Sequence, residues 1–245
     1  AVGHLCPATT ASQEYATAEQ HRVKRIAYRA SYTPEVVHAI LDSAYVCHIS
    51  FVEAGLPQII PMTYWRDGEY VYFHAAARGR FAAACASGPV ALSVTLMDAL
   101  VLGHSAVNHS VNFRSVVVHG QPVVIHEREE KRDAMREFFR RTLPGRWETL
   151  RTVREDELDS MSVFRLGLDQ VAAKVRNEFP DREDYMPEAP VWTGILPCAM
   201  VFGPAVTDNR FPPEALPDHL KGFAGAQLLE VHVARAGVVH VGADA

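Results

Sequence analysis

The pattern of apolar and polar residues changes from a helical to a strand period near residue 45. Before this point, apolar residues recur every three or four positions behind Thr33-Pro34-Glu35, a combination typical of a helix N-terminus. After it, apolar and polar residues alternate, which is typical of strands with one buried face. The first half of the chain therefore predicts helices at 33–44 and 80–86, a tight turn at 66–68, and strands at 46–51, 58–64, 70–74, 90–96 and 100–104.

The second half of the chain predicts one long helix among further strands. Residues 127–143 place Met135, Phe138 and Phe139 on one face, and Pro144-Gly145 follows as a stop signal. Because short turns join most of the strands, we expect antiparallel pairing, and a barrel would remove exposed strand edges. The expected fold is mainly β with flanking helices, a six- or seven-stranded antiparallel β-barrel. The further strands are predicted at 113–119 and 122–126, which would pair around Gly120, and at 163–168 and 171–176.

Composition and charge narrow the possible function classes. Of the 245 residues, 48% are hydrophobic and 22% are charged, so the chain can bury a sizeable core. The formal net charge of -5 argues against general binding to nucleic acid or an anionic membrane, because both need clustered lysine and arginine. No apolar run approaches the ~20 residues that cross a bilayer, and residues 1–20 do not resemble a signal peptide. Four dispersed cysteines indicate reduced thiols and a cytoplasmic protein.

Two common kinds of catalytic site are not favoured by the motifs. Residues 103–107 begin like a nucleophile elbow around Ser105, but Val107 stands where that strained turn needs glycine, and no helix follows. The 12 histidines include no pair at the helical HxxxH spacing, and several alternate with apolar residues on predicted strands. We therefore predict neither a serine hydrolase nor a metal site.

Two basic segments carry a more specific signal. Arg78 and Arg80 flank a glycine where a predicted strand meets a short helix, so guanidinium groups and free helix amides could hold a phosphate together. Arg114-Ser115 opens an apolar strand, where an arginine needs a partner. Either segment alone could be ordinary surface arginines, but the two together favour an anionic ligand.

Pro61 lies inside the predicted strand 58–64. Proline breaks a strand's hydrogen-bond ladder, so nearby backbone groups could bond a planar heteroaromatic ring. The alternative is an edge strand with a protective proline, and the residues alone favour that alternative.

Seven stretches of the chain resemble, in the same order, the pyridoxamine 5'-phosphate oxidase-related, FMN-binding split-barrel family. The similarity is greater to its flavin-nucleotide-binding and nitroimidazole-resistance-like branch than to the true oxidases. The C-terminal substrate-binding pattern of those oxidases is absent, so oxidation of pyridoxamine phosphate is not expected. The matching stretches are 36–41, 60–64, 72–80, 112–120, 144–147, 173–176 and 191–197.

The resemblance implies a homodimer with FMN in a cleft between the subunits. It assigns the isoalloxazine contacts to Pro61, Met62, Thr63 and Tyr64, and the phosphate contacts to Arg78 and Arg80, with Arg114 and Ser115 nearby. Lys174 is counted with the cofactor-binding residues, Trp192 would close the site from the partner chain, and His74 would face the cleft as the catalytic candidate.

The resemblance leads us to expect an FMN-dependent oxidoreductase that acts on a small organic substrate. The flavin would carry the redox chemistry, with His74 or His48 serving if a proton transfer accompanies it. Two alternatives stay open: a non-catalytic flavin or haem binder that uses a histidine as axial ligand, and a structural barrel without ligand. We expect a flexible arm at 1–24, the split-barrel domain at 25–197, and an extension at 198–245 that contains a hairpin at 229–241.

Overall fold

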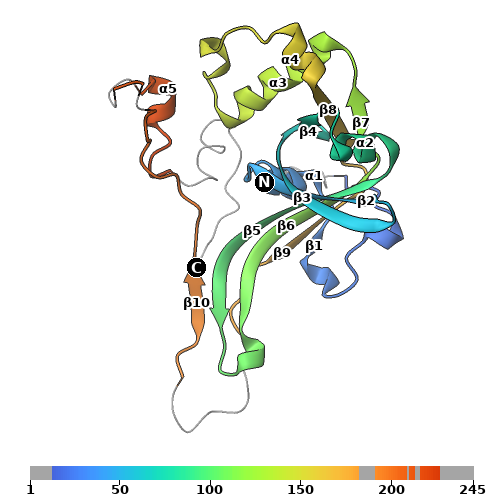
Figure 1. Ribbon diagram of the computed structural model, residues 1–245. Coiled ribbons are helices and arrows are strands. Elements are labelled where there is room, and N and C mark those ends of the chain that lie inside the picture. The colour runs from blue at the N-terminus through green and yellow to red at the C-terminus, as the bar shows by residue number, and fades with distance from the viewer. Residues whose placement is uncertain (1–12, 182–190, 209, 213–215, 227–245) are drawn as a thin grey trace, which may run out of the picture.

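Antiparallel pairing joins ten strands into one sheet in the computed structural model, which describes residues 13–181, 191–208, 210–212 and 216–226 (Figure 1). The strand order is β1-β9-β6-β5-β2-β3-β4-β8-β7, and β10 adds to the free half of β5. The strands are β1 (Ala30–Ser31), β2 (Val46–Glu53), β3 (Leu56–Asp67), β4 (Tyr70–Ala76), β5 (Val90–Leu102), β6 (Ser110–Gly120), β7 (Val123–Ile125), β8 (Met161–Gly167), β9 (Val171–Arg176) and β10 (Gly194–Pro197).

The sheet curls without closing, which confirms the predicted mainly β fold in the form of a split barrel. Its two ends, β1 and β7, do not pair with each other. The described strands number ten rather than six or seven, because three short strands of two to four residues add to the long ones.

Two details of the predicted strand arrangement were wrong. The two strands expected at 90–96 and 100–104 are the single strand β5, in which a bulge between Met97 and Ala99 takes up the polar interruption. The strand expected at 122–126 pairs with β8 instead of with its neighbour β6, and Val124 lies opposite Phe164.

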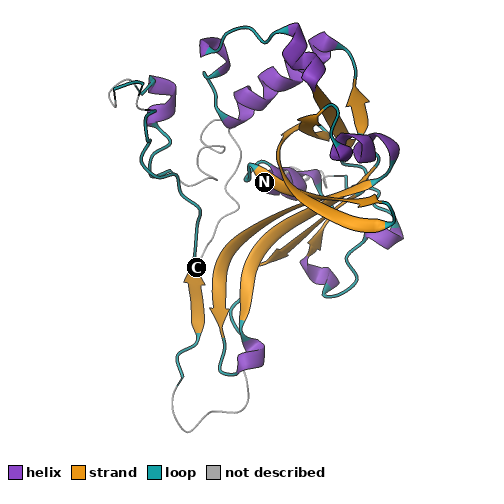
Figure 2. Cartoon of the chain, in the orientation of Figure 1, coloured by secondary structure: helices purple, strands orange, loops and turns teal. Residues whose placement is uncertain are grey.

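Five α-helices flank the sheet in the described residues (Figure 2). The predicted helices at 33–44, 80–86 and 127–143 correspond to α1, α2 and α3, with ends that differ by a few residues. In Figure 1, α3 and α4 lie together at the β4-β8-β7 end of the sheet. The helices are α1 (Pro34–Leu41), α2 (Arg80–Ser87), α3 (Arg128–Thr142), α4 (Glu155–Ser160) and α5 (Asp218–Lys221).

Strand β3 contributes adjacent residues to two separate hydrophobic cores. Tyr64 is only 1% exposed and packs in the main core, which β4, β5, β6 and β8 also line. Trp65 is 3% exposed and packs with Ile125 and Val163 in a second core beneath α3. Because neighbouring side chains of a strand point to opposite faces, β3 is buried on both sides at this point.

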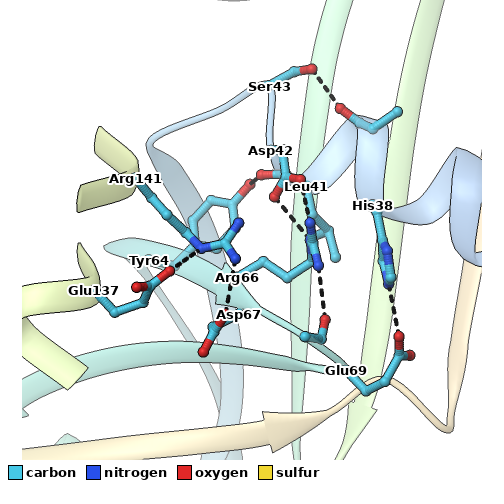
Figure 3. Close-up of polar contacts among 12 residues, drawn as sticks. His38, Leu41, Asp42, Ser43, Tyr64, Arg66, Asp67, Glu69, Glu137 and Arg141 are labelled. Atoms are coloured by element: carbon cyan, nitrogen blue, oxygen red, sulfur yellow. Dashed lines mark hydrogen bonds and ion pairs between the residues drawn. The ribbon is translucent and has the colours of Figure 1, made fainter. Parts of the chain in front are cut away.

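A polar network ties this part of β3 to two helices (Figure 3). The Tyr64 hydroxyl donates to the carbonyl oxygen of Leu41 at the end of α1. The Arg66 guanidinium makes two hydrogen bonds to the Asp42 carboxylate, with Nε 2.9 Å from Oδ1, and a third to the carbonyl oxygen of Gly68 at 2.8 Å. On the α3 side, Arg141 reaches Asp67 at 2.9 Å.

The segments on either side of the barrel are also held to it where they are described. The Thr17 hydroxyl is buried and donates to the carbonyl oxygen of Val171 at 2.6 Å, so the N-terminal segment lies against β9. In the C-terminal extension, the Cys198 amide donates to the carbonyl oxygen of Asp98 at 2.9 Å. The hairpin predicted at 229–241 lies outside the described residues. None of the described helices has both the length and the apolar character needed to span a membrane.

We predict that Tyr64→Phe lowers the free energy of unfolding by about 1–2 kcal/mol, because a buried hydrogen bond to Leu41 is lost while the ring stays in place. Tyr70→Phe is the matched control, since Tyr70 is 43% exposed, and it should change stability by less than about 0.5 kcal/mol. Urea unfolding measures both values. Equal effects of the two substitutions would contradict the role given to the Tyr64 hydroxyl.

Candidate functional site

The loop between β4 and α2 presents a cluster of hydrogen-bond donors. The Gly79 amide donates to the carbonyl oxygen of Ala76 at 2.9 Å, and the first helical hydrogen bond of α2 runs from Ala83 to Gly79 at 3.2 Å. The amides of residues 80–82 therefore have no partner within the helix. A Cβ at position 79 would lie 3.1 Å from the Ala76 oxygen, so glycine suits this tight connection. The helix end can accept a negative group.

The two arginines of this loop differ in their partners. Arg80 forms an ion pair with Glu53 at 3.0 Å, although 67% of its side chain stays exposed. The Arg78 side chain is exposed and forms neither an ion pair nor a hydrogen bond with the described residues. Glu53 neutralises the charge of Arg80. The Arg78 guanidinium and the first amides of α2 therefore remain available to bind an anion. This donor set fits a phosphate group.

The stretch of β3 that leads to this region has only one neighbouring strand. Residues 56–63 pair with β2 without a break, and Pro61 lies opposite His48. On the other side, β4 begins to pair only at Tyr64. The alternative that the residues alone favoured, a strand edge with a protective proline, is confirmed, because Pro61 occupies a strand segment with an open edge, where proline is tolerated.

The four β3 residues predicted to line a flavin ring lie on different faces. The side chains of Pro61 and Thr63 are exposed on the outer face, whereas Met62 packs partly against the main core. Tyr64 is enclosed in that core, and burial raises the pKa of its hydroxyl well above the usual value. Among these four side chains, Pro61 and Thr63 are the two that a ligand on the outer face can reach.

His74 lies beside this outer face. The last β3–β4 pair is Tyr64 with Phe73. Thr63, which precedes Tyr64, and His74, which follows Phe73, therefore both point away from the main core. The Nδ1 atom of His74 is buried and has no hydrogen-bond partner among the described residues. Burial lowers the pKa of the imidazole, so His74 is neutral at neutral pH. Its unpartnered Nδ1 atom can donate or accept one hydrogen bond with a ligand, depending on the tautomer.

The remaining predicted site residues lie on the β5-β6-β9 part of the sheet. Arg114 is held by the Asp98 carboxylate through two hydrogen bonds of 2.9 and 2.7 Å. The Ser115 hydroxyl donates to the carbonyl oxygen of Lys174 at 3.3 Å, and the Lys174 amine donates to the carbonyl oxygen of Arg25 at 3.2 Å. Each of these side chains thus has a partner within the same chain.

Trp192 precedes β10 and is 63% exposed. Its ring lies against Gly194, where a Cβ would come within 2.8 Å of the indole. In sheet order, β5, β2 and β3 separate Arg114 and Ser115 from the arginine loop after β4. One chain thus presents two groups of predicted site residues in different parts of the sheet.

Two carboxylates of these regions were missed by sequence reasoning. Asp98, which binds Arg114, fills the gap between two expected strands, and a polar residue inside an apolar run was the available signal. Glu53, which binds Arg80, precedes the β2–β3 turn and gave no signal, because its partner is 27 residues away in the chain.

An open antiparallel barrel with an anion-accepting loop after β4 is a split-barrel protein. A family profile described as pyridoxamine 5'-phosphate oxidase matches residues 33–175, and the chain belongs to this family. The family's flavin-binding split barrel is therefore the fold of this chain. The comparison with curated proteins gives no match.

Three solved structures illustrate the similarity. The flavocytochrome Anf3 from Azotobacter vinelandii is 32% identical, with a TM-score of 0.80 over 85% of this chain and 98% of its own. The FAD and heme binding protein from Mycobacterium smegmatis is 27% identical, with a TM-score of 0.77 over 82% and 98%. A candidate 5-nitroimidazole antibiotic resistance protein from Bacteroides thetaiotaomicron is 19% identical, with a TM-score of 0.52 over 60% and 86%, and shows the fold alone.

The buried imidazole of His74 predicts a pH dependence of stability. Above about pH 7 both folded and unfolded chains carry a neutral His74, whereas near pH 6.5 the unfolded chain takes up a proton that the folded chain does not. The free energy of unfolding should therefore fall as the pH drops, by at most about 1.4 kcal/mol per pH unit from this group. Urea unfolding between pH 7.5 and 5.5 should show a smaller slope in His74→Gln than in the wild type. Identical slopes would contradict the assignment.

Proposed function

We propose that this chain is a flavin-nucleotide-binding oxidoreductase that acts on a small organic substrate. The observation that carries the proposal is the Arg78 guanidinium, which has no partner among the described residues, next in the chain to the free amides of α2 at the end of β4 in a split barrel. Membership of the family supports it, as do the two similar proteins described as a flavocytochrome and as an FAD and heme binding protein.

The residues of the outer face fit the parts of a flavin nucleotide. Arg78 and the α2 amides would bind the phosphate, with Arg80 shared between it and Glu53. Pro61 and Thr63 would orient the ring, because both are exposed on the outer face of β3 beside an open strand edge. His74 would hold a proton at one ring nitrogen and offer the other to the ligand. The bound flavin would supply the electron transfer.

FMN is the flavin that we propose. Only one compact group of donors is described at the β4–α2 loop, and Glu53 already neutralises one of its two arginines. This arrangement matches one phosphate better than the two of FAD. The M. smegmatis protein described as binding FAD makes FAD the comparison ligand in any titration.

We further propose that a second copy of the chain completes the site. Exposed apolar residues lie on the outer face of β2 and β3, including Val46 at 51% and Ile59 at 66% exposure, and a two-fold partner would cover such a face. The partner would also bring its own Trp192 and Arg114 region toward the arginine loop, which the single chain does not do.

The phosphate assignment predicts a selective effect of Arg78→Ala. The variant should weaken FMN binding by about 1.5–3 kcal/mol, or roughly 10- to 150-fold, through loss of a charge-assisted hydrogen bond. Riboflavin, which has no phosphate, should bind the variant and the wild type alike. Quenching of flavin fluorescence measures both ligands.

The control for that experiment is Arg128→Ala, which removes the same charge from an exposed arginine at the start of α3. It should leave FMN binding unchanged. A loss of FMN affinity equal to that of Arg78→Ala, or an equal loss for riboflavin, would refute the phosphate contact.

If the chain forms the proposed dimer, Ile59→Glu should both separate the subunits and weaken flavin binding. A charge in a buried apolar contact is unfavourable without a partner. Val123→Glu is the control, because Val123 is 51% exposed on β7, which is a terminal strand of the sheet and lies three strands from β3. Sedimentation at micromolar concentration should give twice the chain mass of 27.1 kDa for the wild type and the control, and a single chain for the variant. A single chain in all three would overturn the dimer.

Haem binding is a second candidate, because two similar structures are described as a flavocytochrome and as an FAD and heme binding protein. His48 fits an axial ligand, since it is exposed on β2 opposite Pro61, with the apolar Val46 and Ile59 on neighbouring positions of that face. Haem added to the purified protein should give a Soret band that His48→Ala abolishes. An unchanged band in the variant would exclude His48 as the ligand.

A further inference from the structure

The N-terminal strap, residues 15–25, lies against β9 and the end of β6. Near its start, the buried Thr17 hydroxyl donates to the carbonyl oxygen of Val171 at 2.6 Å. The Ala18 amide then donates to the side-chain oxygen of Gln170 at 2.9 Å. Further along the strap, a contact between two rings fastens it to β6.

This ring contact joins two histidines. The imidazoles of His21 and His119 are stacked, with centroids 4.1 Å apart and an angle of 20° between their planes. Val118 packs in the main core, so His119, the next residue of β6, points to the outer face of the sheet. The Nδ1 atom of His119 is closed off from solvent and has no hydrogen-bond partner among the described residues. The stack is therefore what the His119 side chain contributes to holding the strap.

The stacked rings disfavour each other's positive charge. Burial lowers the pKa of His119, and the neighbouring imidazole of His21 lowers it further. A single proton on the pair meets no like charge in the other ring. A second proton places two cations on rings whose centroids are 4.1 Å apart, and like charges at this separation repel.

The charged groups around the pair do not offset a second proton. They are Glu19 and Arg22 on the strap and Asp169 in the β8–β9 turn, and none forms an ion pair with either imidazole in the described part of the chain. The Arg22 guanidinium lies over a tyrosine ring, and the Asp169 carboxylate lies against Gly167. On the β5 side, the uncharged Ala91 lies opposite His119.

Acid therefore weakens the stack. An unperturbed histidine has a pKa of about 6.5, so a released strap leaves two imidazoles that both take up protons below that pH. The stacked pair resists the second proton, so the closed state binds fewer protons than the open state. The closed state is thus fully favoured above about pH 7, and its equilibrium constant falls by about tenfold for each pH unit below 6.5 and each proton not taken up.

The start of the strap contacts a histidine in a different way. The Tyr15 hydroxyl donates to the Glu69 carboxylate at 2.6 Å and lies 2.9 Å from Nε2 of His38. Glu69 also lies 3.4 Å from this nitrogen, so a proton on His38 meets a carboxylate instead of a second cation. Acid does not weaken this end by repulsion between two rings. The other charged groups around His38 are already paired with one another or with neighbouring carboxylates, and they are Asp42, Arg66 and Arg141.

We propose that the His21–His119 stack is an acid-released clasp. When both imidazoles carry a proton, residues 18–25 leave the β6–β9 side of the sheet while residues 15–17 stay bound. In the closed state the Lys174 amine donates to the carbonyl oxygen of Arg25 at 3.2 Å, and opening frees this amine on the outer face. The clasp does not depend on the proposed flavin binding.

Hydrogen–deuterium exchange of the full-length protein at pH 7.5 and 5.5 tests the clasp. The reporters are the amides of Ala18 and Val23, which donate to Gln170 and to the Tyr32 hydroxyl outside the strap, both at 2.9 Å. Their protection factors, from which the intrinsic pH dependence of exchange is removed, should fall about tenfold at pH 5.5. The Tyr15 amide should lose less protection. The strap amides should also exchange faster than those of β5 at both pH values, because the strap opens without unfolding the sheet.

Two variants separate the charge of the pair from its packing. His21→Phe and His119→Phe each keep two stacked rings but leave only one group that takes up a proton, so the tenfold loss should disappear in both. His126→Gln is the control, because His126 is an exposed histidine after β7. This control should show the same loss as the wild type.

Four outcomes overturn the proposal. They are equal protection of the wild-type strap at both pH values, a tenfold loss that persists in both phenylalanine variants, and a loss that disappears in the His126→Gln control. The fourth is strap protection equal to that of β5, because the strap would then open only when the whole sheet unfolds.

Discussion

The whole arrangement depends on the burial of β3 between two cores. Tyr64 and Trp65 are neighbours in the chain, yet Tyr64 packs in the main core and Trp65 packs in the core beneath α3. The strand cannot slide by one residue, because that shift would exchange the two side chains between spaces of different shape. Arg66 and Asp67 then fix the same strand to α1 and, through Arg141, to α3.

The buried segment around Tyr64 and Trp65 positions the candidate site, whose residues lie on β3 and on β4. On β3, residues 56–63 run away from Tyr64 with one edge open and with Pro61 and Thr63 facing outward. On β4, His74 follows the pair of Tyr64 with Phe73, and the arginine loop comes four residues later. A stable double core thus supports a short polar segment in which Arg78 carries a charge that the described part of the chain leaves unpaired. Many other arginines of the protein, such as Arg114 and Arg66, are already bound to carboxylates.

The sequence was sufficient to predict the secondary-structure elements whose pattern depends on residues close together in the chain. The Thr33-Pro34 helix start, the strand period after residue 45 and the long amphipathic helix all correspond to elements of the structure. The pairing of β7 with β8 could not be predicted, because it depends on Ile125 packing with Trp65 and Val163, which are far away in the chain. The same limit applies to the site. The spacing of Arg78 and Arg80 is visible in the sequence, whereas the Glu53 and Asp98 partners are not. The burial of Tyr64 was hidden because adjacent buried residues on β3 break the simple alternation.

A crystal structure of the protein grown with FMN would test the central claim most directly. The account predicts two copies of the chain, with the flavin phosphate within hydrogen-bond distance of Arg78 and the first amides of α2, and with the ring against the outer face of Pro61 and Thr63. A flavin bound elsewhere, or a phosphate that contacts neither Arg78 nor those amides, would contradict it.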